Sequence, residues 1–139
     1  EYARYVENYY GTPREYVEKM LDEGRDVILE IEIQGALKVK KAFPDTLLLF
    51  VTPPDATELK NRLVGRGTET LDVIKSRLDR ACEEAEGMDS YDYLIVNDDL
   101  NECVEKMHTI IQGEHHRSFR NKAFMKEIKE DLQRLKGED

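Results

Sequence analysis

The sequence is poor in the features that mark membrane, disulfide-bonded and nucleic-acid-binding proteins. No apolar run approaches the roughly 18 residues that a membrane span requires, and the acidic, aromatic N-terminus is unlike a signal peptide. Two cysteines, Cys82 and Cys103, do not make a disulfide framework. Lys and Arg number 21 against 30 Asp and Glu, and the formal net charge of -9 argues against binding along a phosphate backbone. We therefore expect a cytoplasmic globular protein whose partners include neither a membrane nor a nucleic acid.

The sequence does contain enough apolar residues for a core, arranged in alternating strands and helices. Its 139 residues are 40% hydrophobic and 37% charged, which suits one domain with a buried interior. The expected strands cover residues 2–10, 27–33, 47–51 and 93–96. The expected helices cover residues 12–24, 36–43, 55–64 and 70–86. A further helix carries the apolar positions Val104, Met107, Ile110 and Ile111, and a last helix ends near residue 135. Strands that alternate with helices predict an α/β fold with a mainly parallel sheet.

Two glutamates lie near the end of the expected strand over residues 27–33. Glu30 and Glu32 are two residues apart, so a strand would place them on one face. The carboxyl ends of parallel strands are where open α/β sheets bind ligands. The pair has two interpretations. It is a solvated or arginine-paired strand end, or it serves a ligand, as acceptors for a nucleobase or sugar edge or as an outer-sphere partner for Mg²⁺.

Three arginines, Arg62, Arg66 and Arg77, fall on the two charged helices or between them. A guanidinium binds two phosphate oxygens through parallel hydrogen bonds and can stabilise a transferring phosphoryl group. The alternative is helical i,i+4 pairing with Glu58 or Glu69, each pair contributing a few tenths of a kcal/mol. Spacing alone leaves both interpretations open.

Two further groups of side chains are candidates for a site. Tyr10 and Thr12 flank Gly11 and offer a phenol and a hydroxyl beside a turn, although strand tyrosines usually serve packing. His108 and His115 lie two helical turns apart, too far for one shared ion without a third ligand between them. No metal site is predicted from the histidines.

Taken in order, these residues closely resemble the guanylate kinase family over residues 1 to about 117. The matching segments are Glu1, Asn8-Tyr9-Tyr10-Gly11-Thr12, Leu29-Glu30-Ile31-Glu32-Ile33-Gln34-Gly35, Pro53-Pro54, Arg62-x-x-x-Arg66-Gly67-Thr68-Glu69-Thr70, Arg77, and Tyr91-Asp92-Tyr93-x-Ile95-x-Asn97-Asp98-Asp99. The resemblance implies a P-loop NTPase-like nucleoside monophosphate kinase, a three-layer sandwich with a parallel sheet. It also implies ATP-dependent phosphorylation of GMP to GDP.

The resemblance assigns parts of the chain to the parts of such an enzyme. Residues 1–25 would be the C-terminal half of the GMP-binding subdomain, residues 26–54 core, residues 55–86 the lid, and residues 87–139 core and C-terminal helices. The residues that would bind GMP are Glu1, Tyr10, Thr12, Glu30, Glu32 and Gly35. The catalytic lid arginines that clamp phosphates would be Arg62, Arg66 and Arg77. The residues beside ATP would be Arg66, Asn97 and Asp98.

Within the GMP group, the resemblance gives individual roles. Glu1 matches the carboxylate that accepts from guanine N1–H and the 2-amino group, Tyr10 a phenol that bonds the GMP phosphate, and Thr12 a hydroxyl near the base. Glu30 and Glu32 match an acidic pair on the GMP and metal side of the site. Mg²⁺ would arrive with ATP, held mainly by the phosphates and the P-loop, with no dedicated protein ligand set.

The sequence departs from the family in one large feature. It begins at Glu1 and contains no G-x-x-x-x-G-K-[ST] motif, so the P-loop strand, its helix and the backbone cradle for the ATP phosphates are missing. We expect an incomplete and inactive piece whose sheet is completed by the missing N-terminal segment or by another copy. A non-catalytic guanylate-kinase-like interaction module is the alternative, although the retained arginines favour the enzyme.

Overall fold

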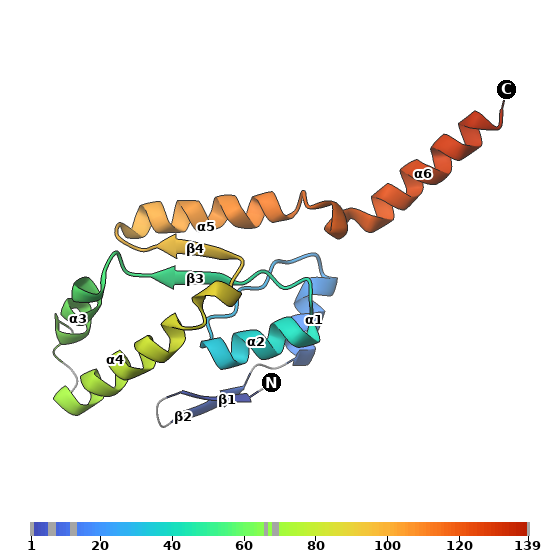
Figure 1. The fold of residues 1–139 in the computed structure, drawn as a ribbon. Helices are drawn as coiled ribbons and strands as arrows, with labels where there is room; N and C mark the ends of the chain where they lie inside the picture. The colour runs from blue at the N-terminus through green and yellow to red at the C-terminus, as the bar shows by residue number, and fades with distance from the viewer. Residues whose placement is uncertain (1, 6–7, 12–13, 66, 68–69, 139) are drawn as a thin grey trace. The chain divides into compact units, whose positions relative to one another are not determined.

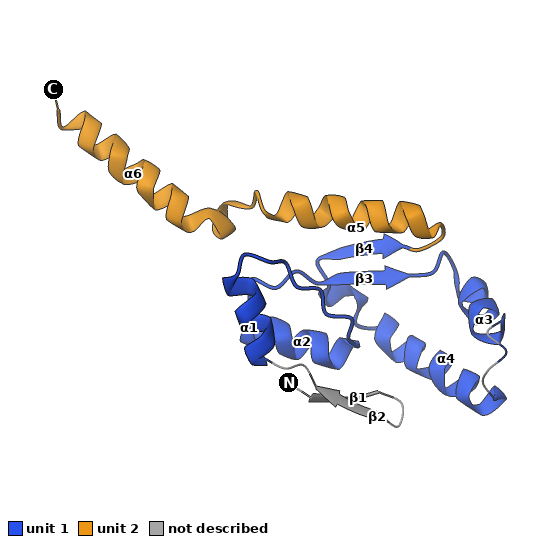
Figure 2. Cartoon of the chain, turned by 180° about the vertical axis from the view of Figure 1, so that it is seen from behind, with its two compact units in different colours: residues 1–96 blue, residues 97–139 orange. Residues whose placement is uncertain are grey.

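The computed structural model describes residues 2–5, 8–11, 14–65, 67 and 70–138, shown as a ribbon in Figure 1. The chain divides into two compact units, Glu1–Val96 and Asn97–Asp139, which Figure 2 colours separately. The first unit mixes strands and helices, and the second is helical in its described residues. The expected α/β class is confirmed by the parallel strand pair and the helices that alternate with it.

The first unit opens with a β-hairpin. β1 (Tyr2–Tyr5) pairs antiparallel with β2 (Asn8–Gly11), and Tyr2 lies opposite Gly11. The prediction of one extended strand over residues 2–10 is therefore wrong. The tyrosine-rich composition does favour strands, but no glycine or proline stands between the two strands to signal a chain reversal.

Helix α1 (Arg14–Asp22) ends where the sequence predicts. Gly24 has a left-handed backbone with φ of 81°, a conformation that costs glycine little. The N–H of Arg25 donates to the carbonyl of Met20 at 3.1 Å and thus satisfies a carbonyl of the last helical turn. Gly24 as the C-terminal stop of this helix is confirmed.

The strand expected over residues 27–33 is not formed. Residues 25–32 belong to no helix or strand, and Ile28 is 68% exposed. Helix α2 (Ile33–Ala42) begins three residues before the expected start at Ala36, because Glu32 caps it. A strand buried on both faces needs hydrogen-bonded neighbours, and among the described residues no strand pairs with this segment.

The parallel sheet consists of β3 (Leu49–Thr52) and β4 (Tyr93–Val96), with Leu49 opposite Tyr93 and Thr52 opposite Val96. The prediction for β4 is confirmed, and β3 starts two residues later than predicted. Leu48, just before β3, is 4% exposed and Ile95 of β4 is 2% exposed. The core of the first unit therefore lies along this strand pair.

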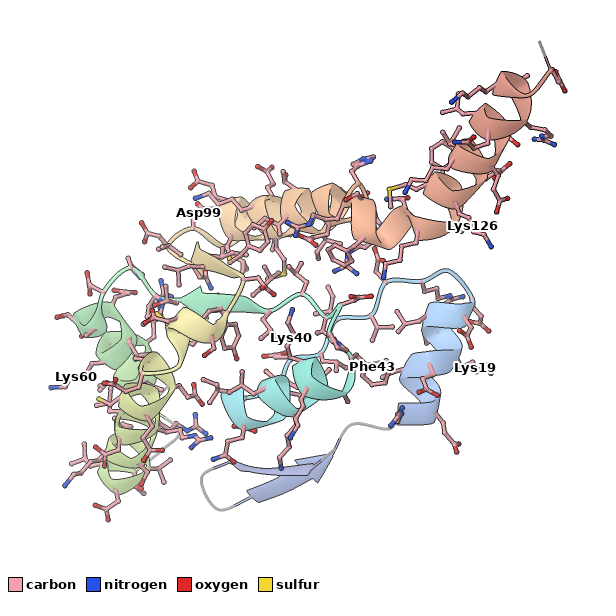
Figure 3. All side chains as sticks on the ribbon, turned by 45° about the vertical axis from the view of Figure 1, so that its right-hand side comes forward. Lys19, Lys40, Phe43, Lys60, Asp99 and Lys126 are labelled. Carbon is pink, nitrogen blue, oxygen red and sulfur yellow. The ribbon has the colours of Figure 1, made fainter. Side chains whose placement is uncertain are left out.

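Asp92 fastens the start of β3 to the start of β4 and to α2. Its Oδ2 accepts the N–H of Leu48 at 2.8 Å and faces Lys40 Nζ at 3.3 Å. Lys40 also donates to the carbonyl of Thr46, and Figure 3 shows its side chain pointing from α2 toward the segment that leads into β3. These contacts place the C-terminal half of α2 beside the sheet.

Two helices follow β3 and carry the charged segment. α3 (Ala56–Gly65) and α4 (Leu71–Ala85) contact each other and match the expected helices closely. Thr70 caps α4, since its hydroxyl accepts the N–H of Val73 at 3.4 Å. A short 3₁₀ helix, Met88–Ser90, leads from α4 into β4.

The second unit contains α5 (Leu100–Glu114), a 3₁₀ turn (Ser118–Asn121) and α6 (Lys122–Lys136). Both long helices agree with the expected ones. Over the described ranges, no helix is long and apolar enough to cross a membrane.

Gly87 allows a close approach between the end of α4 and the start of α2. A Cβ added to Gly87 would lie 1.9 Å from Ile33 Cδ1, so that side chain would have to move. We expect Gly87→Ala to lower the free energy of unfolding by at most about 1 kcal/mol, because the atom that must move is the end of the flexible Ile33 side chain. Chemical denaturation followed by circular dichroism measures the change.

Gly113→Ala is the matched control. No atom lies within 4 Å of the added Cβ, and Gly113 is in α5, where alanine is favoured by up to about 1 kcal/mol. The two variants should therefore shift stability in opposite directions. Stabilisation by both would show that Gly87 is not tightly packed.

Candidate functional site

The predicted site residues are distributed unevenly over the described parts of the chain. Glu1, Thr12 and Arg66 lie outside the described residues, and Tyr10 is described only as part of the backbone of β2. Asn97 and Asp98 belong to the second unit. The described candidates of the first unit are Glu30, Glu32, Gly35, Arg62 and Arg77.

Glu32 is the N-cap of α2. Its Oε2 accepts the N–H of Gln34 at 2.8 Å, and its Oε1 accepts the N–H of Gly35 at 2.9 Å. The side chain is 3% exposed. A buried carboxylate satisfies two of the helix's unpaired amides and lies at the positive end of its dipole. The two candidates Glu32 and Gly35 are thus joined by a hydrogen bond.

Glu30 has a different environment from Glu32. It is exposed, whereas Glu32 is buried. Because residues 25–32 form no strand, the common strand face expected for the two carboxylates does not exist. Glu30 is the member of the pair whose oxygens are accessible to a solvated ligand.

Arg80 is a partner of Glu32 that sequence reasoning missed. It comes from α4, and its Nη2 lies 2.7 Å from Glu32 Oε2. The same guanidinium lies 3.1 Å from Glu83 through Nη1 and 3.4 Å from Glu84 Oε1 through Nε, and its side chain is 14% exposed. The i+3 and i+4 spacing within α4 was visible in the sequence. The contact with Glu32, 48 residues away, was not.

Glu32, Arg80, Glu83 and Glu84 form a cluster in which further negative charge is unfavourable. Burial raises the pKa of the Glu84 carboxyl, Arg80 opposes that rise, and Glu32 adds to it. Burial also raises the pKa of the Tyr91 phenol, with smaller contributions from Glu84 and Glu32. Tyr91 packs edge-on against Phe50 of β3, with ring centroids 5.1 Å apart. The cluster therefore lies beside the sheet, and Arg80 supplies positive charge among its carboxylates.

Arg62 and Arg77 occupy the two charged helices. Arg62 of α3 forms the helical pair anticipated as the alternative to a phosphate role, with its Nε 3.0 Å from Glu58 Oε1. Both side chains of that pair are more than one third exposed, so the pair contributes little free energy and can be exchanged for a ligand. Arg77 is half-buried on α4, one turn before Arg80.

In the second unit, Asn97 and Asp98 lie directly before α5. Asp99 caps that helix, since its Oδ1 accepts the N–H of Glu102 at 3.0 Å. Asp98 is exposed and Asn97 is half-buried. A capped turn of this kind holds the preceding residues at the positive end of the helix dipole. Within the described part of the chain, no group of three His, Cys, Asp or Glu residues is placed to hold a metal ion.

The comparisons with known proteins agree on one family. The guanylate kinase family model matches residues 1–114. The chain is 54% identical over 132 residues to a guanylate kinase of Bacillus cereus. This match covers 95% of the chain and 64% of that protein. It is 56% identical over 117 residues to the guanylate kinase of Lactococcus lactis subsp. lactis, covering 84% of this chain and 57% of that protein.

A solved structure agrees with these matches. The crystal structure of guanylate kinase from Anaplasma phagocytophilum is similar with a TM-score of 0.70 and 30% sequence identity, over 84% of this chain and 56% of that one. The chain thus spans less than two thirds of the length of these relatives.

Proposed function

Because the chain belongs to the guanylate kinase family, we propose that its protein catalyses the ATP-dependent phosphorylation of GMP to GDP. The observation that carries the proposal is the family match over residues 1–114, which includes every residue assigned to the site. GMP and ATP are then its substrates. A coupled assay should detect ADP formation that requires both nucleotides.

Binding of GMP depends on residues at the start of the chain. Glu1 would accept from guanine N1–H and the 2-amino group, Tyr10 would donate to the GMP phosphate, and Thr12 would lie near the base. Adenine presents neither of the donors that Glu1 accepts, so the base is selected by hydrogen bonding. These three roles rest on the resemblance, because the structure does not describe these side chains.

In this proposal, the transferring phosphoryl group is stabilised by Arg62, Arg66 and Arg77. A planar guanidinium offers paired N–H donors that match phosphate oxygens, which lysine cannot reproduce. The weak, exposed pair between Arg62 and Glu58 supports the proposal, because little free energy is lost when a phosphate replaces the carboxylate. Arginines that meet the phosphates only after lid closure act on the transition state.

For ATP, the resemblance assigns Asn97 and Asp98 to the adenine and Arg66 to the phosphates. Bound Mg²⁺ would neutralise phosphate charge, and the accessible carboxylate of Glu30 is the hard oxygen donor that this ion prefers, directly or through water. Both oxygens of Glu32 are already engaged, so Glu30 fits that role better.

The cradle for the ATP phosphates must come from a P-loop, and this sequence contains no such motif. We propose that a P-loop segment outside these 139 residues, or another chain, supplies it. Activity tests therefore use a complemented enzyme, defined as residues 1–139 together with the N-terminal segment of the Bacillus cereus relative. A protein that bound phosphopeptides and transferred no phosphate would favour the interaction module instead.

Glu1→Gln is expected to reduce the preference of the complemented enzyme for GMP over AMP by about 1–3 kcal/mol, because an amide replaces the charged acceptor for two guanine donors. The ratio of kcat/KM for the two nucleotides measures this preference. Glu105→Gln, an exposed position on α5, is the matched control and should leave the ratio unchanged. An unchanged ratio in Glu1→Gln would remove that residue from the site.

A further inference from the structure

Helix α6 carries an apolar stripe that is exposed over almost its whole length. Within α6, all of whose residues the structure describes, none is buried. Four large apolar side chains of the helix are 42% to 63% exposed: Phe124, Ile128, Leu132 and Leu135. An isolated helix of 15 residues is marginal in water, and an apolar stripe of this kind gains its stability from a partner surface.

The stripe has the spacing of a coiled-coil seam. Four apolar residues follow one another at intervals of three, four and three residues: Met125, Ile128, Leu132 and Leu135. They therefore take the a, d, a and d positions of two heptads, the positions that pack knobs into holes between two helices. The opposite face of α6 is polar, since Lys126 Nζ lies 3.9 Å from Glu130 Oε1 there. The helix thus presents one narrow seam.

The two flanks of this seam differ in charge. The e positions are all lysine, and the g positions carry one aromatic and two acidic residues: Lys122, Lys129, Lys136, Phe124, Asp131 and Glu138. In a parallel pair of helices, a g residue faces the e residue five positions later on the other helix, so Asp131 would face Lys136 of the partner subunit. In an antiparallel pair, e positions face e positions, and lysines would face lysines. The flanks are complementary to a second copy in the parallel orientation.

The contacts of Asp131 within its own helix leave this pairing possible. Asp131 contacts Arg134, three residues later, and the two side chains are 43% and 70% exposed. An exposed pair of this kind contributes little free energy, and a carboxylate accepts more than one donor. Asp131 can therefore accept from a lysine of the partner subunit as well.

The stripe is also separate from the proposed active site. The guanylate kinase family model matches residues 1–114 and thus ends before α6, and the assigned site residues lie at or before Asp98. An exposed apolar seam outside the enzyme domain has no role in the proposed reaction, whereas it suits an interface between proteins.

We propose that α6 is a dimerisation helix, which pairs in parallel with α6 of a second copy of this chain. The same surface then serves both subunits, as two-fold symmetry requires. The inference does not depend on the proposed function. Because the seam spans only two heptads, we expect association to vary with protein concentration.

Sedimentation equilibrium of residues 1–139 tests the proposal. The mass should rise from the 16.2 kDa of one chain toward twice that value as the concentration increases. Asp131→Lys and Lys136→Asp should each raise the dissociation constant of the dimer about tenfold, because like charges then face each other at both symmetry-related pairs. An equimolar mixture of the two variants should restore association, since the two changed positions then carry opposite charges.

Two further variants keep the test decisive, with circular dichroism to verify that each folds. Glu130→Lys makes the same charge change as Asp131→Lys on the polar face, and it should alter the dissociation constant less than twofold. Leu132→Asp places a charge in the seam and should abolish the dimer.

Three results would overturn the proposal. Stronger association of Lys136→Asp would indicate antiparallel helices, because that change removes a repulsion between lysines. Association that neither charge variant alters would assign the contact to another surface, such as the sheet edges. A chain that stays monomeric, and that Leu132→Asp makes less stable to urea, would show that the stripe is covered within one chain.

Discussion

Replacing Glu32 with alanine is expected to lower the free energy of unfolding by about 3 kcal/mol. The change removes the cap of α2, which contributes about 1 kcal/mol. It also leaves a largely buried Arg80 without the carboxylate that lies 2.7 Å away, and breaking a buried pair from one side costs several kcal/mol. Glu83 and Glu84 still neutralise Arg80 in part, which keeps the expected loss near the lower end of that range.

Urea denaturation followed by circular dichroism measures this loss. Glu30→Ala is the matched control, two residues earlier in the same segment, and its exposed side chain should change stability by less than about 0.5 kcal/mol. Equal effects of the two substitutions would show that the capping and ion-pair geometry of Glu32 does not stabilise the fold.

Arg77→Lys is expected to lower kcat of the complemented enzyme about 10²-fold while KM for GMP changes little. The phosphate clamp is proposed to form on lid closure, so its loss appears in the transition state and not in substrate binding. Lysine keeps the charge and loses the paired donors, which is why the conservative change is costly. The same result is expected for Arg66→Lys.

Steady-state kinetics with GMP and ATP varied in turn measure both parameters. The control is Arg134→Lys, the same chemical change on an exposed residue of α6, and it should leave kcat unchanged. A kcat of Arg77→Lys within twofold of the unsubstituted enzyme would identify Arg77 as an ordinary helix residue.

The helices were predictable from the sequence because their signals are local. Each helix is indicated by its own apolar periodicity and by residues at its ends, such as Gly24 after α1 and Thr70 before α4. The structure confirms both of these helices. β4 was equally clear, since a short apolar run is followed by the turn residues Asn97 and Asp98.

The strand predicted over residues 27–33 failed because pairing is not local. Its apolar run requires neighbouring strands on both sides, and the sequence of the run cannot show whether such neighbours exist. At the end of this segment, Glu32 makes no strand hydrogen bonds. It caps α2 and forms an ion pair with Arg80 instead.

For the candidate site, the motif series assigns residues, and these assignments stay predictions. The ordered series named Glu32 and Arg77 from the resemblance, whereas Arg80 carries no motif. Its contact with Glu32 joins residues 48 positions apart, which only the fold brings together. Spacing also left two interpretations for Arg62, and the structure shows the helical pair with Glu58.

We propose that these 139 residues carry the base-reading and lid parts of a guanylate kinase and, since they contain no P-loop motif, depend on a P-loop from elsewhere. The most direct measurement is ADP formation from ATP and GMP by purified residues 1–139, verified by mass spectrometry, before and after addition of the N-terminal segment of the Bacillus cereus relative. The account predicts no GMP-dependent transfer by the chain alone and measurable transfer once the segment is added. Transfer by residues 1–139 alone, or no transfer after the two parts are shown to associate, would contradict it.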